Sequence, residues 1–291
     1  MSGAGDPYAH VARAFYRARW FERAMATARV LPRGVLAAAG RASGRAYARR
    51  HAEHRAVTLA NLRRLVPDYP GDGAGVYASF GETLADYFHL GHAADEAIER
   101  VVGERRGFEH LHRAWEGGKG AVLANLHFSF FELGGWVMKH LGMPVVVLTR
   151  PEPEPELSRW RAEFRARWGM ETIEVGADPF VLLEVLQRLK SGQMVAMLVD
   201  RPLPQHRVES RVEGSVLACS NLMFQLAAKA GAPILPMAVW REGGHYHFHA
   251  GAPLPDPRQA GQSGAAEVFW RDLLPLVRAH PEQYYGFEAL P

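Results

Sequence analysis

The sequence predicts an α/β fold, in which a mixed, mostly parallel sheet is flanked by helices and preceded by an N-terminal helical hairpin. After Gly120, short apolar runs alternate with longer amphipathic stretches, a pattern typical of strands followed by helices. Before Gly120 the apolar residues recur at helical spacing, interrupted by prolines and glycines. A chain of 291 residues, 48% of them hydrophobic, is large enough to bury one sizeable core.

The hairpin is expected at residues 8–30 and 34–65, with Pro32 and Gly34 between its helices. Residues 74–90 and the stretch that follows Gly107 predict two more helices. The later predicted strands are 121–126, 144–149, 171–175, 193–199, 232–240 and 245–251. The helices between them are expected at 129–141, 155–169, 179–192 and 220–231. The turn "REGG" at 241–244 predicts that the last two strands pair antiparallel. We divide the chain into an Arg-rich region, 1–70, and an α/β domain, 71–291.

Cysteine content and hydropathy restrict the class of protein. The chain has a single cysteine, Cys219, which excludes an internal disulfide framework and a cysteine-based zinc site and indicates a reducing compartment. The N-terminus lacks the basic and apolar regions of a signal peptide. No apolar run reaches the roughly 18 residues that a membrane-spanning helix needs. The sequence therefore predicts a cytoplasmic protein without a transmembrane helix.

Positive charge is concentrated near the N-terminus. Residues 7–64 contain thirteen arginines and two glutamates, a net charge of +11, whereas the rest of the chain carries −8. Aromatic and aliphatic residues are interspersed among these arginines, a mixture that favours binding to an anionic membrane surface. The alternative is a set of helices with solvated arginine faces. Nucleic acid is ranked last as a partner, because the segment carries no nucleic-acid motif.

The stretch "AVLANLHFSFFELGG" supplies the main candidate for chemistry. His127 follows a predicted strand, and the carboxyl ends of parallel strands are where ligands bind in open α/β sheets. With His127 in the loop and Glu132 in the first helical turn, the carboxylate is expected to accept a bond from one imidazole nitrogen. The other nitrogen then faces the crevice as a general base.

Ordinary structural roles compete with this interpretation. "SFFE" matches a capping box, in which Ser129 caps the helix and Glu132 reaches back to its backbone N–H. His127 could equally be a buried histidine satisfied by a main-chain carbonyl. The local spacing alone leaves the two interpretations about even.

The stretch "GFEHLHRAWEGGKGAVLANLHFSFFELGG" resembles the lipid A late acyltransferase (lauroyl/myristoyl acyltransferase) family of the lysophospholipid acyltransferase superfamily, whose members carry a His-x4-Asp/Glu motif. Other matching stretches follow in the family's order, so that the resemblance covers roughly residues 55–287. They are "VTLANLRRLVPD", "VVVLTRP", "GQMVAMLVD", "LAAKAGAPILPMAV" and "RAHPEQYYGF". The family usually has Asn and Trp where this chain has Phe130 and Phe131. The membrane span typical of the family is replaced here by the Arg-rich hairpin.

The resemblance implies a glycerolipid acyltransferase-like fold and direct acyl transfer. His127 would act as general base and Glu132 would orient it. The acyl donor would be an acyl carrier protein or coenzyme A thioester, a co-substrate, and no other cofactor and no metal is expected. The acceptor would be a hydroxyl or amine of a lipid or glycolipid, as in lipid A biosynthesis. The location would be peripheral, on the cytoplasmic face of the bacterial inner membrane.

Two other function classes remain open. The first is an esterase or thioesterase that uses the same pair with water as acceptor. The second is a non-catalytic lipid-binding protein, expected if Phe130 and Phe131 close the crevice. Six further residues are assigned to substrate binding, with a surface ion pair, a packing role or a helix cap as their ordinary alternatives. They are Phe128, Ser129, Arg150, Asp200, Arg201 and Arg207. Asp200 ends a buried strand, where an unpaired carboxylate would be costly.

Overall fold

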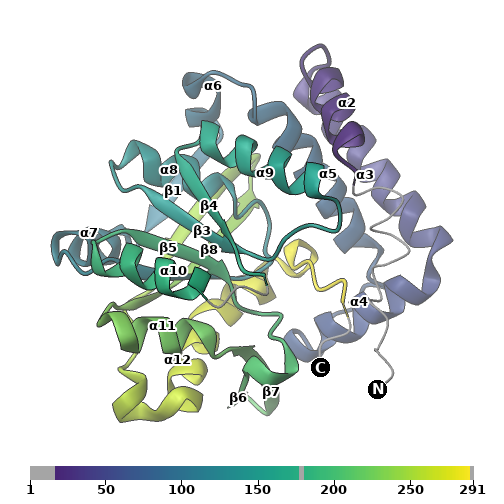
Figure 1. Ribbon diagram of the computed structural model, residues 1–291. Coiled ribbons are helices and arrows are strands. Elements are labelled where there is room, and N and C mark those ends of the chain that lie inside the picture. The colour runs from purple at the N-terminus through teal and green to yellow at the C-terminus, as the bar shows by residue number, and fades with distance from the viewer. Residues whose placement is uncertain (1–16, 177–179, 289–291) are drawn as a thin grey trace.

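The computed structural model describes residues 17–176 and 180–288 (Figure 1). Its centre is a seven-stranded sheet in the order β1-β9-β8-β2-β5-β3-β4. The strands are β1 (Val102–Arg106), β2 (Ala121–Asn125), β3 (Val145–Thr149), β4 (Met170–Glu174), β5 (Met194–Leu198), β8 (Ile234–Glu242) and β9 (His245–Ala250). β8, β2, β5, β3 and β4 run parallel, and β9 is antiparallel to β8. The predicted α/β class and the antiparallel addition are both confirmed.

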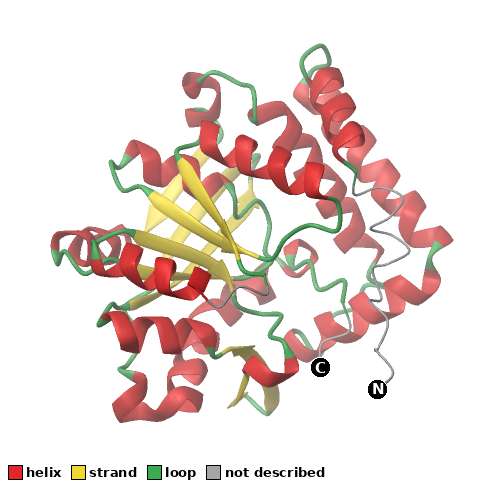
Figure 2. Cartoon of the chain, in the orientation of Figure 1, coloured by secondary structure: helices red, strands yellow, loops and turns green. Residues whose placement is uncertain are grey.

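Helices cover both faces of this sheet (Figure 2). One face packs against α10 (Phe180–Lys190), α11 (Leu222–Ala230) and α12 (Pro257–Ala279), and the other against α7 (Phe108–Glu116), α8 (Leu133–His140) and α9 (Pro155–Arg167). Alternation along β2 explains how one strand serves two cores: Val122 and Ala124 belong to the first hydrophobic cluster, Ala121 and Leu123 to the second. A strand buried on both faces reads as an uninterrupted apolar run.

The N-terminal region folds into helices that pack against the α/β domain. α2 (Ala18–Ala28) and α3 (Arg33–Arg50) form the predicted hairpin, and α3 lies against α5 (Ala74–Leu90). The approach is close because glycines face each other: a Cβ added to Gly40 would lie 2.2 Å from the carbonyl oxygen of Gly81. The expected second helix, 34–65, instead breaks at His51, and α4 (Ala52–Leu65) follows. Residues 8–16 of the first predicted helix lie outside the described residues.

Several elements were not predicted. They are α6 (Asp95–Glu99), β1, α12, the short 3₁₀ turns Pro204–His206 and Pro281–Gln283, and a separate two-stranded sheet. This second sheet pairs β6 (Arg207–Val212) antiparallel with β7 (Ser215–Ser220). The turn between its strands has Glu213 and Gly214 at positive φ, as a two-residue hairpin of type I′ requires. Among the described residues, no helix has the length and apolar character to cross a membrane.

Candidate active site

His127 lies where the sequence places it, in the loop between β2 and α8, just beyond the carboxyl end of the strand. Its neighbour across the sheet is set by strand register. Asn125 of β2 pairs with Leu198 of β5, and His127 and Asp200 each lie two residues beyond that pair. Because the two strands are parallel, the polar residues that follow them emerge at the same edge of the sheet.

Asp200 is the carboxylate that binds the imidazole. The Nδ1 atom of His127 lies 2.7 Å from Oδ1 of Asp200, and the main-chain N–H of His127 donates to both carboxylate oxygens at 3.2 Å. The Asp200 side chain is fully buried, whereas the His127 side chain is 22% exposed. Nε2 of His127 bonds none of the described residues, and the ring lines the main cavity. This nitrogen is therefore available to a ligand.

The electrostatics of the pair favour a neutral imidazole beside an ionised carboxylate. Burial disfavours the charged ring and lowers the pKa of His127 below its ordinary value, and the positive charge of Arg201 acts in the same direction. Burial alone would raise the pKa of Asp200, but the contacts with His127 and Arg201 outweigh burial and hold that pKa below its ordinary value. With the proton on Nδ1 facing Asp200, Nε2 can accept a proton from the cavity.

The expectation that Glu132 binds His127 is wrong. Oε1 of Glu132 accepts bonds from Arg165 of α9, 3.0 Å from Nε and 2.9 Å from the terminal nitrogen. Both side chains of this ion pair are more than 90% buried. The capping box is not formed either, because α8 begins at Leu133 and has no side-chain cap. Glu132 was predicted from its spacing to His127 and from the family motif, yet its carboxylate binds a neighbouring helix.

A cavity of about 800 Å³ extends from the His127 loop. Its lining includes the strand ends, α5, α9 and Phe21 of α2. Phe130 and Phe131 lie on its wall, and the ring of Phe131 meets that of His127 edge-on at 6.2 Å. The two aromatic residues thus leave the cavity open and shape its wall beside His127.

The remaining predicted residues divide between this cavity and its surroundings. Arg150, exposed at the end of β3, and the buried Ser129 both line the cavity. Arg201 lines it too, while its guanidinium contacts the carbonyl of Tyr285 and the carboxylate of Glu288. Phe128 does not line it, because its ring is buried in the core.

Arg207 also lies away from the main cavity. It pairs with Glu209 and borders a much smaller cavity behind Asp200. Cys219 is buried, and burial raises the pKa of its thiol to about 12, which keeps it protonated and unreactive.

Within the described residues, no group of three His, Cys, Asp or Glu side chains gathers to hold a metal ion. Two of the alternating histidines of β9 have separate partners: His249 pairs with Asp272, and His247 accepts a hydrogen bond from the main-chain N–H of Glu104. Sequence reasoning missed Arg165 and the C-terminal residues Gln283–Tyr285 that border the site. The only signal for the latter was the family-like stretch "RAHPEQYYGF".

Comparison with known proteins identifies the family of the chain. A profile of the family described as bacterial lipid A biosynthesis acyltransferase matches residues 11–289. Phosphatidylinositol mannoside acyltransferases from two Mycobacterium tuberculosis strains are each 27% identical over 190 residues, which is 65% of this chain and 58% of theirs. That of Mycolicibacterium smegmatis is 29% identical over 137 residues, 46% of this chain and 45% of its own. The match thus spans 58% or less of the length of these relatives. The profile match covers nearly the whole chain, which therefore belongs to the bacterial lipid A biosynthesis acyltransferase family.

Proposed function

We propose that this protein transfers a fatty acyl chain from a thioester donor to a hydroxyl or amine of a lipid or glycolipid acceptor, with His127 as general base and Asp200 as its partner. The observation that carries the proposal is the imidazole itself. Its Nδ1 is held by a buried carboxylate at 2.7 Å, and its Nε2 is open to a cavity of about 800 Å³. Family membership supplies the reaction class.

In the proposed reaction Nε2 of His127 takes the proton of the acceptor group as its oxygen or nitrogen attacks the thioester carbonyl carbon. The new carbon–oxygen or carbon–nitrogen bond forms and the carbon–sulfur bond breaks. The departing thiolate takes the proton back from the imidazolium, which restores the enzyme. The buried Asp200 carboxylate stabilises the transient imidazolium and holds its tautomer. No nucleophile of the protein is needed.

The two co-substrates are proposed by chemical class. The donor is an acyl carrier protein or coenzyme A thioester, and the acceptor is a membrane lipid that carries sugar or phosphate. The names of the mycobacterial relatives support a glycolipid acceptor. Arg150 is placed to meet an acceptor phosphate, because its exposed guanidinium borders the cavity and is paired with none of the described residues.

The turn between α2 and α3 carries the apolar side chains that we expect to enter a membrane interface. Val30 is 78% exposed and Val35 is 52% exposed, and Trp20 and Leu31 lie near them in the sequence and are also exposed. Arg19 and Arg23 lie over the Trp20 ring, at 5.5 and 5.2 Å from its centre. Phe21 of the same helix lines the cavity, so docking of α2 on anionic lipid would bring the cavity to the bilayer. We propose peripheral binding to the cytoplasmic face of the bacterial inner membrane.

The catalytic part is tested by His127→Ala, with His249→Ala as the matched control. His249 also pairs with an aspartate, at 2.8 Å from Asp272, and has nearly the same exposure, but it lies outside the cavity lining. With acyl-coenzyme A or acyl carrier protein and a bacterial lipid extract, mass spectrometry should show a lipid that gains one acyl chain. His127→Ala should lower this transfer by at least about 10²-fold and His249→Ala should leave it unchanged. Equal activity of the two variants would remove His127 from the mechanism.

The same assay separates the rival functions. Rapid release of stoichiometric free fatty acid without acceptor would indicate an esterase or thioesterase. Binding of lipid without any transfer or hydrolysis would indicate a lipid-binding protein. The cavity beside His127, open past Phe130 and Phe131, favours catalysis over that last outcome.

Membrane binding is tested by vesicle sedimentation at low salt, with anionic and neutral vesicles compared. Replacing Arg19, Arg23 and Arg29 by glutamine should weaken binding to anionic vesicles, at about 1 kcal/mol for each charge. The control variant replaces Arg113, Lys119 and Arg211, which removes the same charge on and near α7 and the small sheet, away from α2 (Figure 1). An equal loss of binding in both variants would contradict the assignment to the α2–α3 turn.

A further inference from the structure

A C-terminal segment runs beside the His127 loop and is hydrogen-bonded to it. The main-chain N–H of Ser129 donates to the carbonyl of Gln283, and that of Tyr285 donates to the carbonyl of His127, both at 2.8 Å. Between these two bonds Phe128 pairs with Tyr284 in an antiparallel bridge. We call Gln283, Tyr284 and Tyr285 the C-terminal strap. Three consecutive residues of the loop, beginning with His127, are thereby fixed by three consecutive residues of the strap.

The loop needs such support because its backbone is strained. Ser129 has φ of 50°, in the left-handed region that non-glycine residues rarely adopt. That conformation costs about 1–2 kcal/mol for a residue with a Cβ. Strained residues persist only where the surrounding structure over-determines them. The bond from the Ser129 N–H to Gln283 is one such restraint.

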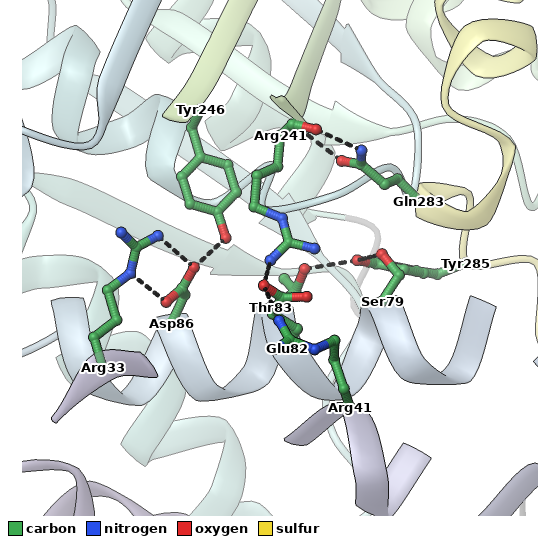
Figure 3. A network of polar contacts seen from close by, with 10 residues as sticks. All are labelled: Arg33, Arg41, Ser79, Glu82, Thr83, Asp86, Arg241, Tyr246, Gln283 and Tyr285. Atoms are coloured by element: carbon green, nitrogen blue, oxygen red, sulfur yellow. Dashed lines mark hydrogen bonds and ion pairs between the residues drawn. The ribbon is translucent and has the colours of Figure 1, made fainter. Parts of the chain in front are cut away.

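The strap is in turn held by side chains on its outer side (Figure 3). The Gln283 amide acts like a neighbouring strand, since its Oε1 accepts the N–H of Arg241 and its Nε2 donates to the Arg241 carbonyl, both at 2.8 Å. The Tyr285 hydroxyl bonds Oγ1 of Thr83 on α5 at 2.7 Å and lies 3.4 Å from Oγ of Ser79. The strap is thus tied both to the end of β8 and to α5.

Tyr284 lies between these anchors and meets the other member of the pair. Adjacent side chains of an extended segment point to opposite sides. Tyr285 therefore reaches α5, while Tyr284 points to the opposite side, where it borders the small cavity together with Asp200. Burial, together with the charge of Asp200, raises the pKa of Tyr284 well above its ordinary value, so the hydroxyl stays protonated and can donate. The strap thereby bonds His127 and lies beside Asp200.

We propose that the C-terminal strap positions the His127–Asp200 pair, and that Gln283 and Tyr285 are positioning residues that act on His127 through the strap's main chain. This inference rests on the proposed function, because it assigns a role in the same reaction. A reacting group displaced by about 1 Å can lose as much as 10²-fold in rate even when the fold survives. Loosening one anchor of the strap should therefore affect turnover more than substrate binding.

The test compares Tyr285→Phe with Tyr77→Phe. Tyr77 is also a buried tyrosine and lies in α5. Its hydroxyl bonds the hydroxyl of Thr58 at 2.9 Å. Each variant removes a tyrosine–threonine hydrogen bond and keeps its ring, and Tyr285→Phe also removes the longer contact with Ser79. Tyr77 neither lines the cavity nor bonds the strap. We expect both variants to lower the melting temperature by similar amounts. Tyr285→Phe should lower kcat about tenfold with KM for the thioester donor unchanged, and Tyr77→Phe should keep the wild-type kcat.

A second measurement reports on the geometry of the His127–Asp200 pair and does not depend on turnover. The His127 Nδ1 proton, held against Asp200, should exchange slowly with water and give a resolved downfield proton resonance. Tyr285→Phe should speed this exchange at least about tenfold, whereas Tyr77→Phe should leave it unchanged. Equal kcat and equal exchange in the two variants would overturn the role of the strap. If instead His127→Ala stays active, the proposed function fails, and the exchange measurement still decides whether the strap holds the pair.

Discussion

Asp200 and Glu132, two buried carboxylates at the same site, have partners of different chemistry. Asp200 binds an imidazole whose second nitrogen faces the cavity, whereas Glu132 binds the guanidinium of Arg165. An imidazole can exchange a proton near neutral pH, but an arginine stays charged under all ordinary conditions. The first pair is thus equipped for proton transfer. The second can only hold α8 and α9 together and set a fixed charge on the cavity wall.

The largest effect should come from Asp200→Asn. Asparagine lacks the negative charge that stabilises the imidazolium. Its amide N–H can also donate a hydrogen bond to Nδ1, which favours the tautomer with the proton on Nε2. Transfer should fall by about 10²–10⁴-fold, measured as kcat, with a melting temperature near that of the wild type. Asp272→Asn, the same change at the His249 pair outside the cavity, is the control. A wild-type rate in Asp200→Asn would show that the histidine needs no carboxylate.

Glu132→Gln should act on stability instead. It leaves the Arg165 guanidinium, 6% exposed, without its counter-charge, and breaking one side of such a buried ion pair costs about 3–5 kcal/mol of unfolding free energy. Chemical denaturation would measure the loss. Replacing both partners by apolar residues, Glu132→Leu with Arg165→Met, should recover most of that free energy.

The double variant also tests the contrast between the two pairs, because it shows whether the charges of Glu132 and Arg165 contribute to the reaction. If the stable double variant keeps kcat, the pair is structural. If its kcat falls while stability returns, the fixed charges themselves contribute to catalysis, and the contrast with Asp200 is weaker than the geometry indicates.

The pH dependence of stability and of the rate should follow the pKa of His127. The pKa of His127 is lowered in the folded protein, so between that pKa and about 6.5 the unfolded chain binds more protons than the folded one. The contribution of His127 to the unfolding free energy is therefore complete above about pH 6.5, falls as the pH drops from there to the folded pKa, and is lost below it. The rate should follow, losing about tenfold per pH unit once His127 is protonated. An acidic limb of kcat/KM above pH 6.5 would contradict this direction.

Sequence pattern predicted the sheet, most of its strands and the position of His127, because these depend on local periodicity. The partner of His127 depends on strand order instead. β2 and β5 are neighbours although β3 and β4 come between them in the chain, and only the packing of the whole sheet decides this. Local spacing left Glu132, five residues away, about even between a helix cap and a partner of His127, and the family motif favoured the partner. Asp200 instead reaches the imidazole through the register of two strands.

Other differences have similar causes. The break at His51 involves neither proline nor glycine, so helical periodicity alone could not place it. The β6–β7 hairpin did carry a local signal, alternation around the turn at Glu213 and Gly214, and was overlooked. The C-terminal strap could not be predicted, since its contacts with the loop join segments far apart in sequence.

The smallest predicted effect concerns Ser129, which lies between His127 and Glu132 in the chain. Its hydroxyl is buried, and none of the described residues lies within hydrogen-bonding distance of it, so the side chain gains little from its position. Ser129→Gly relieves about 1–2 kcal/mol of left-handed strain but adds about 0.5–1 kcal/mol of backbone freedom to the unfolded chain. The unfolding free energy should therefore rise by no more than about 1.5 kcal/mol. Ser129→Ala keeps the strain and should therefore be less stable than Ser129→Gly. A lower kcat in both variants would assign the hydroxyl to the substrate, alongside the His127–Asp200 pair.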